Sequence, residues 1–133
     1  MPHSTVVAQV SPGGVQLVAD LPISELKAAT DDRPAADAGD YILRHADIVG
    51  ADGRTWRKRA SAAEAGARDG VAVMTVTVTF TAPPGGAVQA RRLRYDAILH
   101  RIASHVVRVY RREGEALIPM SRLQSPTIEL DLP

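Results

Sequence analysis

The chain contains no cysteine. Disulfide bridges, thiolate metal sites and thiol nucleophiles are therefore excluded, and the redox compartment stays open because a domain without cysteine folds in either environment. Aromatic residues are also scarce, at 4% of 133 residues. Carbohydrate-binding modules and single-strand nucleic-acid binders need flat stacking faces, so this scarcity disfavours both functions. The available aromatic side chains are Tyr41, Trp56, Phe80, Tyr95 and Tyr110.

The sequence also has neither a strong net charge nor a long apolar run. The formal net charge of +1 gives no overall field to attract phosphate backbones, so we expect no nucleic-acid partner. No apolar run approaches the roughly eighteen residues that cross a bilayer, and "MPHSTVVAQV" lacks the regions of a signal peptide. The chain enters a strand-like pattern by Ser4 and stops directly after another, "TIELDLP". We therefore expect a soluble domain excised from a longer protein.

The sequence does contain enough apolar residues for one sizeable core. Hydrophobic residues make up 45% of the chain and charged residues 23%, and the length predicts a single domain over residues 1–133. The clearest strand signal runs from Val71 to Ala82, where apolar residues alternate with threonines. This pattern predicts a long central strand with one buried face and one wet face.

Clusters of glycine and proline divide the rest of the chain into short strands. The turn signals include "SPGG" and "PPGG", and an Asp52-Gly53 pair predicts a hairpin whose return strand is "TWRKRASAAEA". Helical patterns occur in "ISELKAAT" and in "DYILRHADIV", where Tyr41 and His45 are four residues apart. Residues 30–39 predict a flexible loop. We therefore predict a mainly β fold, an antiparallel β-sandwich (Ig-like) of about seven or eight strands with one or two short helices.

Candidate metal ligands lie in "YDAILHRIASHVVRVYRR". Asp96, His100 and His105 would make a three-ligand set for nickel, copper or zinc, and His3 is a further candidate near the chain terminus. On one helix or one strand, Asp96 and His100 share a face and His105 does not. The set converges only if the chain bends between Leu99 and Ser104. The structural alternative, which the spacing favours, is that Asp96 caps a strand end and His105 closes the start of the next strand through a ring hydrogen bond.

Signals for catalysis are weak. No serine lies in a Gly-x-Ser-x-Gly elbow, and no Gly-x-Gly-x-x-Gly or P-loop pattern is present. A small hydrolase could be assembled only from Asp96 and His100, a pair that most proteins of this size would offer. We therefore favour a protein that is not an enzyme and that needs no cofactor.

A group of arginines near the end of the chain suggests a charged surface. It would meet an anionic lipid surface or a protein partner, or it would simply be the solvated face of edge strands, where charged side chains discourage sheet association. The sequence favours the solvated face. The residues are Arg91, Arg92, Arg94, Arg101, Arg108, Arg111 and Arg112.

Four segments together carry a family resemblance: "MPHSTV", "LPISEL", "YILRHADIVGADGRTW" and "RRLRYDAILHRIASHVVRVYRR". They resemble the extracytoplasmic amino-terminal region of the HupE/UreJ-type membrane proteins, named for hydrogenase and urease accessory proteins. The resemblance implies a periplasmic domain that follows a signal peptide, precedes a bundle of membrane helices and has the membrane-embedded part of its own chain as a partner. It also implies nickel or cobalt transport for some members, by histidines in the membrane helices, so no transport residue is carried over to this chain.

The sequence thus leads to three functional hypotheses. The first is a non-enzymatic extracytoplasmic domain of a bacterial membrane protein that serves assembly, partner binding or gating. The second is a metal-binding module for nickel, copper or zinc that supports a metal transporter through His3, Asp96, His100 and His105. The third is a small hydrolase.

Overall fold

The computed structural model describes residues 3–31 and 38–133, which form nine strands and two helices. The strands are β1 (Ser4–Ser11), β2 (Gly14–Pro22), β3 (Ala46–Gly50), β4 (Arg57–Arg68), β5 (Val71–Thr81), β6 (Ala90–Tyr95), β7 (Val107–Glu113), β8 (Ala116–Leu123) and β9 (Glu129–Asp131). The helices are α1 (Ile23–Ala29) and α2 (Ala38–His45).

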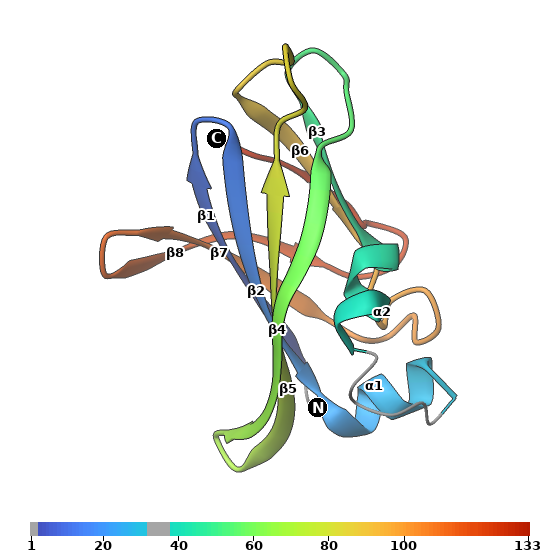
Figure 1. Cartoon of the computed structure of the whole chain (residues 1–133). Coiled ribbons are helices and arrows are strands. Elements are labelled where there is room, and N and C mark those ends of the chain that lie inside the picture. The colour runs from blue at the N-terminus through green and yellow to red at the C-terminus, as the bar shows by residue number, and fades with distance from the viewer. Residues whose placement is uncertain (1–2, 32–37) are drawn as a thin grey trace.

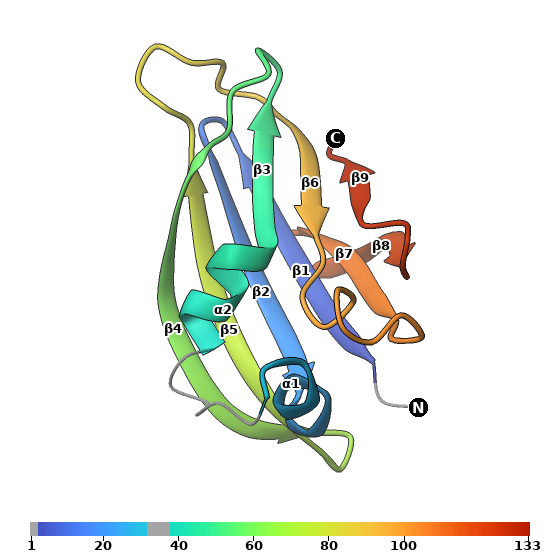
Figure 2. The same cartoon turned by 90° about the vertical axis from the view of Figure 1, so that its right-hand side faces the viewer.

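The strands form two sheets. A six-stranded sheet has the order β4-β5-β2-β1-β7-β8, and a three-stranded sheet has the order β3-β6-β9. Figure 1 shows β1, β2, β5 and β4 as long neighbouring strands, and Figure 2 shows the small sheet and α2 lying over one face of the large sheet. All pairs are antiparallel except β1 with β7, which is parallel. The predicted mainly β sandwich is confirmed, with more strands than expected and one parallel pair.

The core lies between the sheets, and β5 contributes one of its two faces to this core. Met74, Val76, Val78 and Phe80 are buried, while the alternating threonines face outward and are partly or fully exposed. Each large apolar side chain that is buried stabilises the fold by about 1.5–3 kcal/mol. Because β5 pairs with β4 on one side and with β2 on the other, the predicted central strand with one wet face is confirmed.

The predicted hairpin at residues 52–53 is only partly correct. The tight turn is present, with φ of +81° at Gly53, but β4 pairs with β5 in the large sheet. An isolated bridge from Val49 to Thr55 pairs β3 with the segment just before β4. The indole of Trp56 is buried beside Gly50, where a Cβ atom would lie 2.5 Å from its Nε1. The chain therefore leaves the small sheet at Trp56 and crosses to the large one, a long-range step that local turn chemistry does not show.

The two predicted helical patterns are confirmed as α1 and α2. Most of the predicted loop, residues 32–37, lies outside the described residues, and Ala38 and Gly39 already belong to α2. A Cβ atom on Gly39 would lie 3.1 Å from that of Ala60 on β4, so the start of α2 approaches the large sheet closely. Neither described helix is long and apolar enough to cross a membrane.

Burial also removes most aromatic side chains from the surface. Tyr41, Trp56, Phe80 and Tyr95 are all buried, and Tyr110 is half-buried. Stacking of sugars or bases on a row of exposed rings therefore has no platform among the described residues.

Candidate functional site

A concentration of titratable side chains lies where α2 meets the connection from β6 to β7. Tyr41 and His45 are one turn apart on α2 and so project from one face of the helix. Asp96 follows β6 directly, and His100 lies in the turns after it. We call these four residues the histidine cluster.

One continuous path of contacts joins the histidine cluster. The Ile98 amide donates to Tyr41 Oη at 2.7 Å, and Tyr41 Oη lies 2.9 Å from His100 Nε2. The His100 and His45 rings stack with centroids 4.1 Å apart and planes 7° apart. His45 Nδ1 lies 2.8 Å from Asp96 Oδ1. Since the tyrosine hydroxyl accepts from Ile98, its single proton is available to His100 Nε2, which fits a neutral His100 protonated on Nδ1.

Burial and neighbouring charge set the protonation of this cluster. Burial raises the pKa of Tyr41 to about 12, so its hydroxyl stays protonated near neutral pH. Burial, and then the adjacent His45, lower the pKa of His100. Arg94 Nη2 lies 3.6 Å from Asp96 Oδ2, the carboxylate oxygen that does not bond His45. The arrangement therefore favours a neutral His100.

The cluster supports a strained turn. Ile98 has a φ of +67°, a conformation that β-branched residues rarely adopt and that costs of the order of 1–3 kcal/mol. Its side chain is fully buried, and its carbonyl accepts from the amides of Arg101 and Ile102. Tyr41 satisfies the Ile98 amide. The helix α2 thus holds in place the turn that the sequence requires between β6 and β7.

The four predicted metal ligands are not brought together. Asp96 and His100 share the histidine cluster, but Asp96 bonds His45 and His100 bonds Tyr41. The chain does bend after Leu99, and the bend carries His105 into the interface between β1 and β7, away from this cluster. Within residues 3–31 and 38–133, no group of three or more histidine, aspartate or glutamate side chains is placed to hold a metal ion.

His105 makes a buried contact with Ser4. Ser4 Oγ lies 2.7 Å from His105 Nε2, and the two residues are 0% and 2% exposed. The spacing is that of a nucleophile and its base, but a substrate cannot reach a pair that is sealed in this way. Burial lowers the pKa of His105. The pair fastens the start of β1 beside β7, as the structural alternative for His105 predicts.

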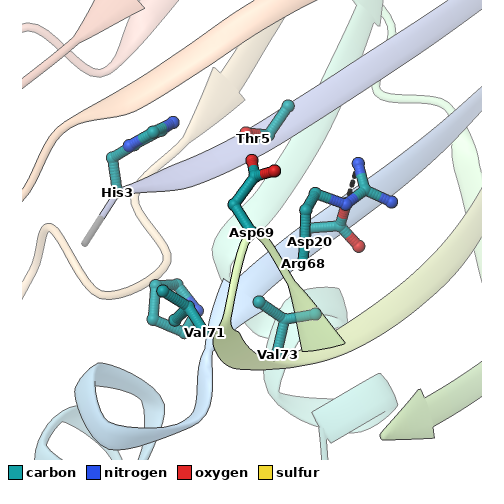
Figure 3. Close-up of a pocket in the computed structure, with 8 residues that line it drawn as sticks. His3, Thr5, Asp20, Arg68, Asp69, Val71 and Val73 are labelled. Atoms are coloured by element: carbon teal, nitrogen blue, oxygen red, sulfur yellow. Dashed lines mark ion pairs between the residues drawn. The ribbon is translucent and has the colours of Figure 1, made fainter. Parts of the chain in front are cut away.

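His3 lies in a different place, at the rim of a pocket of about 410 Å³ (Figure 3). Inside this pocket the Asp20 side chain is only 8% exposed, and its Oδ2 lies 2.7 Å from Arg68 Nη1. Thr75 Oγ1 donates to the other carboxylate oxygen. The buried carboxylate is therefore already neutralised by the protein. Burial, and then Arg108, lower the pKa of His3.

The predicted group of arginines does not form one surface. Arg92 and Arg94 lie on β6 of the small sheet, whereas Arg108 and Arg111 lie on β7 of the large sheet. Several arginines are paired with nearby carboxylates. This agrees with the interpretation that they form the solvated face of edge strands. The pairs are Arg92 with Glu129 and Asp131, Arg94 with Asp96, Arg101 with Asp31, and Arg111 with Glu113.

Sequence reasoning missed His45 and Tyr41 as members of the site. Their spacing of four residues is visible in the sequence and predicts one helical face. Nothing local places that face against Asp96 and His100, which follow some fifty residues later, at separations of 51 and 59 residues for the two hydrogen bonds. The site can therefore be recognised only from the folded structure, in which these distant segments meet.

Comparisons with known proteins give no further identification. No protein-family model matches the chain. No protein of curated function matches it either.

Replacing Tyr41 with Phe tests the support of the strained turn. The change leaves the buried Ile98 amide without its partner, so we expect the free energy of unfolding to fall by about 1–3 kcal/mol. Urea denaturation followed by circular dichroism measures this. The control is Tyr110→Phe, since Tyr110 is half-buried and its hydroxyl has no hydrogen bond to a described residue. Equal stability of the two variants would contradict the assigned role.

Stability should also depend on pH through His105. Its pKa in the folded protein lies below the ordinary value of 6.5, so the unfolded chain binds protons more readily. The contribution is fully present above about pH 6.5 and is lost as pH falls through the lowered pKa. We expect urea denaturation between about pH 7.5 and 5.5 to show this loss, and His105→Gln, which cannot titrate, to reduce it. An unchanged slope in the variant would show that His105 is not the titrating group.

Proposed function

We propose that the protein is a non-enzymatic extracytoplasmic domain of a bacterial membrane protein, which serves assembly, partner binding or gating. One observation supports the absence of catalysis most directly. The side chains that could carry chemistry are bonded to one another: Tyr41 to His100, His45 to Asp96, and Ser4 to His105. Their geometry holds segments of the fold together, and none of these six side chains is an activated nucleophile at the surface.

The space beside the histidine cluster supports the same proposal. The pocket there has a volume of about 160 Å³. Ligand pockets of enzymes and small-molecule receptors usually enclose about 300–1,000 Å³. Arg101 on its rim is held by Asp31, through contacts of 2.9 and 3.4 Å. A small site in which Tyr41, His45, His100 and Arg101 already have partners suits contact with a partner surface better than turnover of a substrate.

The resemblance to the HupE/UreJ-type region supports the location. The segments that carry it include β1, the end of β2, α2 with β3, and the connection from β6 to β7. These same segments build the histidine cluster and the contact between Ser4 and His105. In this proposal the membrane-embedded part of the same chain is the first partner.

The metal-binding module remains as the alternative function, although its four ligands lie apart. Calorimetric titration with nickel, copper and zinc separates the two functions. We expect no binding tighter than about 1 mM. Stoichiometric binding that is lost in His100→Ala or His105→Ala would favour the metal module instead.

The location is tested in the bacterium that carries the gene. An antibody against this domain should detect the protein in the membrane fraction, and protease added to intact spheroplasts should remove the signal. A cytoplasmic protein detected in the same samples serves as the control for intact cells. Recovery of the domain in the soluble cytoplasmic fraction, protected from protease, would contradict the proposal.

A further inference from the structure

The outer face of the large sheet carries a second pocket that the proposed function does not use. Its volume is about 380 Å³, and it lies over β4 and β5, which run side by side in Figure 1. The small sheet and α2 cover the opposite face (Figure 2). We call it the arginine–threonine pocket; its lining is Arg57, Lys58, Arg59, Thr79 and Thr81.

The sheet register concentrates hydrogen-bond donors in this pocket. Arg57 lies opposite Thr81, and Arg59 lies opposite Thr79. Opposed residues of antiparallel strands share a face with their Cβ atoms about 4.5–5.5 Å apart, and alternate residues of one strand share a face about 6.5 Å apart. Two guanidinium groups and two hydroxyl groups therefore surround one hollow. Gln16 on β2, opposite Thr79, continues the row with an amide.

The pocket has positive charge that the protein does not neutralise. Arg57 and Arg59 are exposed, and neither forms an ion pair with any residue that the structure describes. Lys58 is held by Asp47 and by the Ala46 carbonyl. No carboxylate lines the pocket. Like charges placed together on one sheet face repel, so a bound anion would relieve this repulsion.

We propose that the arginine–threonine pocket binds the phosphate group of an anionic lipid headgroup. Arginine offers a planar fork of donors that matches phosphate oxygens, and threonine hydroxyls add donors of their own. The hollow is shallow and open and has no aromatic ring to stack a base, which suits a headgroup better than a nucleotide. This inference rests on the proposed function, because attachment to a membrane brings the sheet near lipid phosphates.

Vesicle sedimentation tests the proposal with the purified chain. We expect the protein to bind vesicles that contain phosphatidylglycerol and not to bind vesicles of phosphatidylcholine alone. We expect it to dissociate from the vesicles as the salt concentration is raised. Arg57→Gln with Arg59→Gln should weaken binding about 30-fold, from about one kcal/mol for each basic residue near the surface. The control removes the same charge elsewhere, with Lys27→Gln and Arg91→Gln, both at exposed positions.

The outcomes separate the pocket from general electrostatics. Equal weakening of vesicle binding in the two double variants would contradict binding at the pocket, since the loss of net charge alone would explain the weakening. Binding of inorganic phosphate without binding of vesicles would overturn the lipid as its source. Binding of neither would overturn the anion site itself. These failures are distinct from failure of the proposed function, because protease digestion of spheroplasts reports the location whether or not the pocket binds lipid.

Discussion

A single buried hydrogen bond, from the Ile98 amide to the Tyr41 hydroxyl, fixes the part of the structure on which the rest depends. The connection from β6 to β7 has to leave the small sheet, turn sharply and enter the large sheet parallel to β1. The turn requires a positive φ at a buried isoleucine, which is unfavourable for a β-branched residue. A partner that bonds the amide and lies in a fixed helix offsets this strain and prevents an orphaned buried donor.

This turn determines which side chains meet in the candidate site and where β7 joins the large sheet. It places His100 against His45 and leaves Asp96 within reach of the same helix. Further along the connection, His105 arrives beside Ser4 and fastens β7 to β1. These side chains therefore join segments that are distant in the chain. A surface whose arginines have no ion pair with a described residue lies elsewhere, on the outer face of β4 and β5.

The sequence predicts those features that depend on local periodicity. The alternation in β5, the turns rich in glycine and the helical spacing of Tyr41 and His45 are all local, and the structure contains each of them. The fold class follows from their number. The transfer of β4 to the large sheet is not predictable in this way, because it depends on Trp56 packing beside Gly50. The same holds for the histidine cluster, whose two halves come from α2 and from the turn after β6.

The most direct test of this structural role is hydrogen exchange of the Ile98 amide, measured by NMR in the native protein. If the bond to Tyr41 holds the connection in place, the amide is protected by tertiary structure and exchanges only when the whole domain unfolds. We expect its exchange free energy to equal the free energy of global unfolding. Exchange as fast as that of an exposed loop amide would show that the turn opens locally and would contradict the role assigned to the bond.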